Sequence, residues 1–463
     1  MTAPHGVTAK SAAPEDRARP STALSPGPRS KIGIVIAASL AAGLLAAVLL
    51  PFLPFVPPPA VDHDFATAMV LLGFAVGWAL LAVLSRRTDQ PQRWAVVPAV
   101  FMGSSAVLVL VLPDDWVDAL GWVWPPALLA LVVWMFGRAR RDLHSRARAW
   151  LLYPVLATLL VVSLGGAYET VGRSTAARPV VGGRLVDVGP YRLHLQCFGT
   201  GTPTVVIEPG GGASAATLGW ITPAVARETR VCVYDRAGRG WSDPAAIPPD
   251  GAQVAADLHT LPDNARVPGP YVLAGHSFGG LYVQAFAARN PHQVAGLVLV
   301  DSTAPGSGPV PPPPSDSYSV VKRVSALLST TARVGLPRLL TGMSPSDLPQ
   351  QSQAELQATA STPEEVAGVI EEYAVAGRST RAAGQLTSLD GKPLVVLTAD
   401  LGTAPGWGED QDAMARLSTN SRHDVVDGAT HATLVEDPEH AAEVSQAIVD
   451  VVESVRTSTP LPR

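Results

Sequence analysis

A serine between two glycines is the first residue in this sequence whose setting could support chemistry. Residues 271–286 read YVLAGHSFGGLYVQAF, in which an apolar run leads directly into Gly-His-Ser-Phe-Gly and a helix-like stretch follows. A strand–Gly-x-Ser-x-Gly–helix pattern places a serine hydroxyl on a tight turn, where Gly275 and Gly279 avoid clashes with neighbouring backbone. The amide groups at the start of the helix favour developing negative charge. The pattern predicts a nucleophile at Ser277, and His276 on the sheet side of the turn is interpreted as structural.

A serine hydroxyl needs a neighbouring base to become an effective nucleophile, and His431 suits that role. It lies on a loop that follows a short strand expected at 423–427. His423, at the start of that strand, and His440, inside the following helix, are interpreted as structural. A histidine with no function on a surface loop is the alternative for His431, and the serine turn argues against it.

The segments that must position these residues indicate an α/β domain. From about Val180, short β-rich runs such as TVVIE, GLVLV and PLVVL alternate with helix-like stretches. Continuously apolar strands have both faces covered, which is typical of a mainly parallel sheet between helices. Residues 306–314 form a proline-rich linker, and helices are expected over 317–389. An insertion there would lie over the carboxyl edge of the sheet, so we interpret it as a lid.

Residues 184–455 resemble the α/β-hydrolase superfamily. Besides the serine turn, YDRAGRGWSD (234–243) resembles the family's D-R-x-G-x-G-x-S-D loop, and PGGGASAATLGW (209–220) resembles its oxyanion turn. The resemblance implies a mainly parallel, doubly wound sheet with a helical lid. It also implies a Ser–acid–His triad in that chain order. No metal-ligand spacing appears in the sequence, and no cofactor is implied.

Carried over residue by residue, the resemblance implies that Ser277 is the nucleophile and His431 the base. It implies that the backbone N–H groups of Phe278 and Gly211 bind the oxyanion. Pro209 stands where the family has the histidine of a His-Gly pair, and this change leaves the backbone donor in place. Because the nucleophile is a serine and not an aspartate, epoxide hydrolase and dehalogenase chemistry are disfavoured.

The acid of the triad has two candidates. Its task is to hold the imidazole tautomer and stabilise the imidazolium. Most of the family places it after the seventh strand, a few residues beyond Asp400, where Gly402 has the usual spacing. Some relatives use the end of the sixth strand, where Asp301 falls. We place Asp301 slightly ahead of Asp400, with Asp410 and Asp412 as the next places to look. Either of the first two could instead cap a turn.

Two cysteines are relevant to whether the hydrolase domain lies in an oxidising compartment. The resemblance puts Cys197 on the second strand and Cys232 on the fourth, which are neighbours in the family's sheet. A disulfide between them could persist outside the cytoplasm. Two buried free thiols are the alternative.

The first third of the chain is expected to lie in a membrane. Nearly charge-free runs, each close to the ~20 residues that a spanning helix needs, occur in succession. They are Ile32–Leu53, Phe65–Leu84, Trp94–Leu112, Trp116–Phe136 and Trp150–Tyr168. A bundle of buried soluble helices is the alternative, which this many consecutive runs disfavour.

The loops between these runs predict the orientation. SRRTDQPQR and GRARRDLHSRARA carry several Arg residues, whereas PPPAVDHD and PDD carry none. Because Lys and Arg are retained on the cytoplasmic side, the amino terminus is predicted to be cytoplasmic and everything after Tyr168 extracytoplasmic. The chain is predicted to consist of a disordered tail (1–30), a membrane region (31–168), a linker (169–183), the hydrolase domain (184–455) with its lid at about 305–390, and a tail (456–463).

These observations predict a multi-pass cell-membrane protein with an external serine hydrolase domain. The expected substrate is an ester or related acyl compound, small or lipid-like, and the reaction proceeds through an acyl-enzyme. A net charge of −5 provides no basic surface for nucleic acid. Acyl transfer to an alcohol with the same triad, and a non-catalytic receptor or scaffold with a retained fold, are the alternatives.

Overall fold

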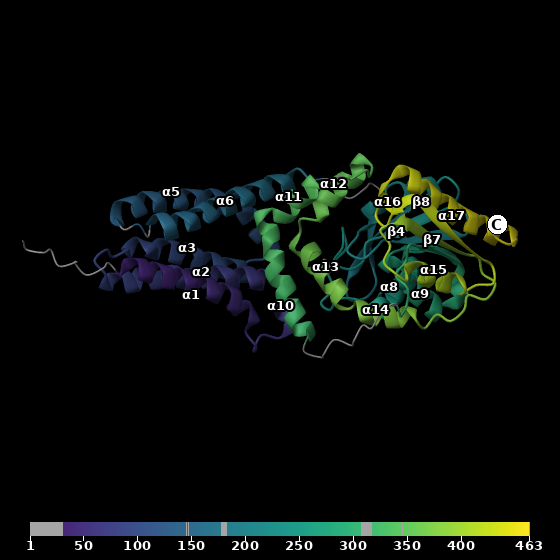
Figure 1. Ribbon diagram of the computed structural model, residues 1–463, viewed down its shortest axis with the longest axis horizontal. Helices are drawn as coiled ribbons and strands as arrows, with labels where there is room; N and C mark the ends of the chain where they lie inside the picture. Colours follow the sequence, from purple (N-terminus) through teal and green to yellow (C-terminus); the bar gives the residue numbers. More distant parts are fainter. Residues whose placement is uncertain are drawn as a thin grey trace, which may run out of the picture.

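The protein divides into an elongated helical bundle and an α/β unit, joined by the lid helices (Figure 1). A computed structural model describes residues 31–144, 146, 148–176, 183–306, 317–344 and 346–462. The predicted tail at 1–30 lies outside the described residues, as do most of the predicted proline-rich linker and part of the predicted linker at 169–183.

The bundle contains the helices that the apolar runs predict. They are α1 (Ile32–Leu49), α2 (His63–Leu84), α3 (Val96–Val111), α4 (Asp114–Ala119), α5 (Trp124–Asp142) and α6 (Tyr153–Ser174). Four are long and apolar enough to cross a membrane, and α4 with α5 would make a fifth span, bent by 48°. Their outer faces are apolar, with Val111 72% exposed and Val161 67% exposed. Such faces suit a hydrocarbon environment.

The helices of the bundle differ from the predicted apolar runs in two places. The run Trp116–Phe136 is not one helix, because the chain bends near Val123. A new helix, α5, starts there with prolines in its first turn. The last helix does not end at Tyr168 but continues to Ser174. Its Glu169 is 2% exposed and pairs with Arg338 of the lid at 2.8 Å, so this carboxylate does not mark a helix end.

The basic loops of the bundle meet at one end. The loop after α2 and the loop after α5 are joined by Gln92 Nε2, which donates to the Asp142 carbonyl (3.2 Å), and by the His144 amide, which donates to Gln90 Oε1 (2.8 Å). Figure 1 shows this end to be the one remote from the α/β unit. The Arg-rich loops and the α/β unit therefore lie at opposite ends of the bundle.

The α/β unit is built on one sheet in the order β1-β2-β4-β3-β5-β6-β7-β8. The strands are β1 (Arg184–Asp187), β2 (Arg192–Phe198), β3 (Thr204–Glu208), β4 (Val231–Tyr234), β5 (Tyr271–His276), β6 (Val294–Val300), β7 (Leu394–Leu401) and β8 (Ser421–Thr430). β2 runs antiparallel to β1 and β4, and the pairs from β4 through β8 are parallel. This is the mainly parallel sheet that the apolar runs predict.

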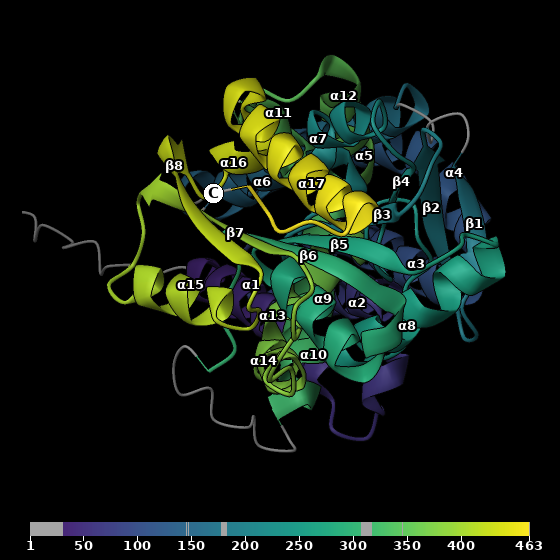
Figure 2. The ribbon, with the colours of Figure 1, turned by 90° about the vertical axis from the view of Figure 1, so that its right-hand side faces the viewer.

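Helices cover both faces of the sheet (Figure 2). One core lies under α8 (Gly251–Ala265), α9 (Phe278–Arg289) and α15 (Trp407–Ala415). The other lies under α7 (Ile221–Val225), α16 (Thr433–Glu436) and α17 (Pro438–Thr457). The doubly wound architecture is confirmed. The predicted tail after 455 begins later than expected, because α17 runs to Thr457 and Leu461 packs into the second core.

The lid is inserted between β6 and β7, as predicted. It comprises α10 (Ser317–Ser329), α11 (Leu336–Met343), α12 (Gln350–Thr359), α13 (Pro363–Ala374) and α14 (Ala376–Ala383). Helix α10 packs on both α13 and α2, so the lid lies between the sheet and the bundle (Figure 1). Arg323 of α10 donates to the carbonyls of Pro51 (2.9 Å) and Val56 (2.6 Å) at the bundle end. The lid is therefore bonded to the bundle as well as packed on it.

Candidate active site

The serine turn has the backbone geometry that its sequence predicts. Ser277 connects β5 to α9 with φ 54° and ψ −122°, a conformation that is strained for a residue with a side chain. A Cβ at Gly275 would lie 2.6 Å from the carbonyl carbon of Gly279, and a Cβ at Gly279 would lie 2.3 Å from the carbonyl oxygen of Glu208. Both flanking positions therefore require glycine for the turn to close.

His431 and Asp301 form a short side-chain pair at the carboxyl edge of the sheet. His431 Nδ1 lies 2.6 Å from Asp301 Oδ2, and the imidazole is 47% exposed whereas the carboxylate is 2% exposed. Asp301 Oδ1 accepts hydrogen bonds from Trp407 Nε1 (2.6 Å) and from the Ala399 amide (3.2 Å). Burial opposes ionisation of Asp301, but the bonds from His431, Trp407 and Ala399 outweigh it and lower its pKa.

The other candidate acids lie elsewhere. Asp400 is exposed at the end of β7, where its Oδ2 accepts from the Gly428 amide at 3.3 Å. Asp412 Oδ1 lies 2.7 Å from Nδ1 of His423, one of the histidines interpreted as structural. Among the two preferred candidates, the structure therefore brings Asp301 and not Asp400 to His431.

His276 places the His431 loop beside the serine turn. Its Nε2 lies 2.9 Å from the His431 carbonyl, and the two imidazole rings are 4.6 Å apart between centroids. Burial, and then the neighbouring His431, lower the pKa of His276 to about 4. His276 therefore stays neutral at pH 7, with Nε2 as the donor to the carbonyl.

The predicted oxyanion turn packs against the serine turn. A Cβ at Gly210 would lie 3.4 Å from Ser277 Cβ, and a Cβ at Gly211 would lie 3.1 Å from the Phe278 ring. In the described part of the chain, the amides of Gly210, Gly211 and Phe278 donate no hydrogen bond. Backbone donors are thus available on both sides of Ser277.

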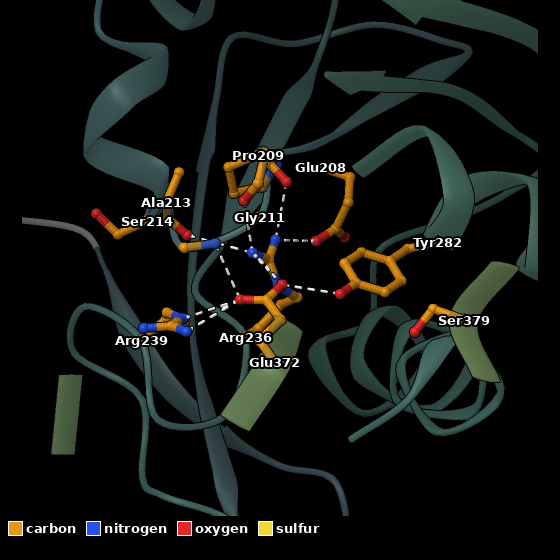
Figure 3. Close-up of polar contacts among 12 residues, drawn as sticks. Glu208, Pro209, Gly211, Ala213, Ser214, Arg236, Arg239, Tyr282, Glu372 and Ser379 are labelled. Carbon is orange, nitrogen blue, oxygen red and sulfur yellow. Dashed lines mark hydrogen bonds and ion pairs between the residues drawn. The ribbon is translucent and has the colours of Figure 1, made fainter. Parts of the chain in front are cut away.

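A buried ionic network behind the oxyanion turn was not identified from the sequence (Figure 3). Arg236, in the loop after β4, pairs with Glu208 at the end of β3 (2.7 Å) and with Glu372 of the lid helix α13 (2.9 Å). Glu372 also accepts hydrogen bonds from Tyr282 Oη (2.8 Å) and from Arg239 (3.0 Å). The D-R-x-G-x-G pattern includes Arg236, whereas Arg239 falls at a variable position of it, and no local signal pointed to their partner in the lid.

The arginines offset burial to different extents at the two carboxylates of this network. Burial raises the pKa of Glu208 to about 7, and Arg236 counteracts only part of the effect. For Glu372, burial also acts to raise the pKa, but Arg236 and Arg239 together lower it below its usual value. Glu372 is therefore the carboxylate that stays ionised against the two guanidinium groups.

Cys197 on β2 and Cys232 on β4 face each other in register and are joined by a disulfide. Within the described ranges, no three His, Cys, Asp or Glu side chains are grouped so that they could hold a metal ion.

Comparisons with known proteins agree with this architecture. Residues 203–438 match the family described as alpha/beta hydrolase fold. The chain is 34% identical over 121 residues to 2-hydroxy-6-oxo-2,4-heptadienoate hydrolase of Pseudomonas putida, covering 26% of this chain and 44% of that protein. It is 33% identical over 132 residues to an uncharacterized vacuolar membrane protein of Saccharomyces cerevisiae, covering 24% of this chain and 20% of that protein.

Among solved structures, a thermophilic esterase from Thermogutta terrifontis is 25% identical, with a TM-score of 0.44, over 60% of this chain and 99% of the esterase chain. The chain spans less than half the length of the curated relatives named above. The helices of the bundle are long and apolar enough for a membrane protein.

Proposed function

Because this chain belongs to the α/β-hydrolase family, we propose that it is a serine hydrolase that cleaves an ester or related acyl bond. The observation that carries the proposal is the His431–Asp301 pair beside the strained Ser277 turn. A buried carboxylate that remains ionised can hold the imidazole tautomer in which Nε2 is free to accept a proton. Ser277, His431 and Asp301 then act as nucleophile, base and acid.

In the proposed reaction, Ser277 Oγ attacks the acyl carbonyl carbon while His431 Nε2 takes the hydroxyl proton. The carbonyl oxygen becomes an oxyanion that the N–H groups of Gly211 and Phe278 stabilise. His431 returns the proton to the departing alcohol, which leaves an acyl group on Ser277. A water molecule, deprotonated by His431, attacks this acyl-enzyme, and His431 returns the proton to Ser277 Oγ as the acid is released. Net consumption is one water per bond cleaved.

We place the reaction on the extracytoplasmic side of a cell membrane. The location of the Arg-rich loops at the bundle end remote from the α/β unit supports this orientation, because Lys and Arg are retained in the cytoplasm. The disulfide between Cys197 and Cys232 supports an oxidising compartment. A site held next to a membrane suits a lipid-like acyl substrate.

The test uses the full-length protein purified in detergent. Wild type should hydrolyse chromogenic esters of graded acyl length and should be labelled by a fluorophosphonate probe. Ser277→Ala should lose the label and several orders of magnitude in kcat, as loss of a nucleophile does. Ser388→Ala, at an exposed serine, is the matched control and should behave as wild type. Near-normal turnover by Ser277→Ala would refute the proposal.

A further inference from the structure

The guanidinium of Arg236 lies against the carbonyl groups of the oxyanion turn (Figure 3). It is 3% exposed. Its Nη1 donates to the Pro209 carbonyl at 2.9 Å, and its Nη2 donates to the Gly210 carbonyl at 2.7 Å. One planar cation therefore binds two consecutive peptide groups of the turn.

The geometry of the peptide bond determines where the N–H groups of this turn point. In a trans peptide group the carbonyl and the N–H of the following residue are coplanar and point in opposite directions. Because the carbonyls of Pro209 and Gly210 point to Arg236, the N–H groups of Gly210 and Gly211 point away from it. The turn contacts the serine turn at Gly210, whose Cβ would lie 3.4 Å from Ser277 Cβ.

The lid supplies the anion that holds Arg236 in place. One oxygen of Glu372 lies 2.9 Å from Arg236 Nη2, and the other accepts from the Gly212 amide at 3.0 Å. Glu372 thus binds both the guanidinium and the turn that the guanidinium orients. Tyr282 adds to the site, because its ring lies 5.1 Å from the Arg236 guanidinium carbon and its hydroxyl donates to Glu372.

We propose that Arg236 is a positioning residue of the oxyanion hole and that Glu372 of the lid holds it in that role. This inference rests on the proposed serine hydrolase function. Donors that are oriented before the reaction stabilise the oxyanion without reorganisation during the reaction. The positive charge beside the Gly210 carbonyl also polarises the peptide group and strengthens its N–H as a donor. Arg236 never touches the substrate and acts only through the turn.

We expect that a lysine at position 236 cannot replace Arg236 in supporting kcat. A Lys ammonium is a compact point charge and lacks the planar fork that contacts both carbonyls. Arg236→Lys should therefore lower kcat by about 10²–10³-fold with a much smaller change in KM, comparable to the loss of one oxyanion donor. Glu372→Gln keeps the side-chain shape but removes the charge, and should give a smaller loss in the same direction.

The decisive measurement compares an oxoester with the matching thionoester. A thiocarbonyl sulfur accepts hydrogen bonds poorly, so an intact oxyanion hole gives a preference for the oxoester. Arg236→Lys should reduce that preference at least tenfold. Arg239→Lys is the matched control, because Arg239 belongs to the same network but makes no bond to the Pro209 or Gly210 carbonyl. It should keep the wild-type preference, and thermal unfolding checks that each variant is folded.

The outcomes separate the two proposals. A folded Arg236→Lys with the wild-type oxoester preference would overturn the role of Arg236. The same holds if Arg239→Lys lowers the preference as much as Arg236→Lys does. If Arg236→Lys does not fold, Glu372→Gln with an unchanged preference has the same consequence. Ester turnover that survives Ser277→Ala would instead overturn the hydrolase mechanism itself.

Discussion

Replacing His276 with Gln should make the protein less sensitive to acid. His276 is buried against the serine turn, and its pKa is lowered to about 4 by burial and by His431. Its Nε2 lies 2.9 Å from the His431 carbonyl. A Gln side chain can place an amide N–H near the position of Nε2, so His276→Gln keeps this bond and removes the titrating group.

The sign and size of the effect follow from linkage. The folded protein keeps His276 neutral, whereas the unfolded chain takes up a proton at the ordinary pKa of about 6.5. The contribution of His276 to stability is therefore fully present above pH 6.5 and is lost as the pH falls from 6.5 towards the folded-state pKa of about 4. Between pH 8 and pH 5 the wild type should lose about 2 kcal/mol on this account. His276→Gln should not lose it.

Thermal unfolding of the full-length protein in detergent, recorded at pH 8 and pH 5, measures the difference. The Tm of His276→Gln should fall less than the Tm of wild type over this interval. His292→Gln, at an exposed histidine, is the control and should follow wild type. Because His276 has no proposed part in proton transfer, the variant should also retain ester turnover at pH 8. An equal fall in Tm for wild type and His276→Gln would refute the reasoning.

Two further experiments address the acid and the topology. Asp301→Asn should lower kcat by about 10⁴-fold, since a neutral amide no longer holds the His431 tautomer. Asp400→Asn should have little effect, and equal, mild losses in both variants would place the acid elsewhere. A reporter that is active only in the cytoplasm should be silent when fused after Arg463, whereas an alkaline phosphatase fusion there should be active. Cys197 and Cys232 should resist alkylation until a reductant is added, and free alkylation together with cytoplasmic reporter activity would reverse the proposed orientation.

Several features followed from the sequence alone because they depend on local chemistry. Gly275 is required by a contact within the serine turn, so the motif itself indicated the turn, whereas the contacts that require Gly279 come from Glu208 and Pro209 after β3. Continuous apolar runs indicated a covered parallel sheet, and long charge-free runs indicated the bundle helices. His431 could be selected because it follows the last strand of the sheet.

Other features depended on which distant segments come together. Asp301 follows β6 and Asp400 lies near the end of the neighbouring parallel strand β7. Only the positions of Trp407, the Ala399 amide and His431 show which carboxylate is buried and bonded. The apolar run Trp150–Tyr168 is also shorter than α6, which continues to Ser174 with Glu169 buried and paired with Arg338 of the lid.

The ionic network behind the oxyanion turn was decided by tertiary structure alone. Arg236 is a recognisable residue of a loop motif, but its partner Glu372 lies in a lid helix whose sequence has no pattern that marks it. A buried charge is tolerated only where an opposite charge and hydrogen bonds reach it. That condition depends on the packing of α13 against the loop after β4, which no local stretch of sequence encodes.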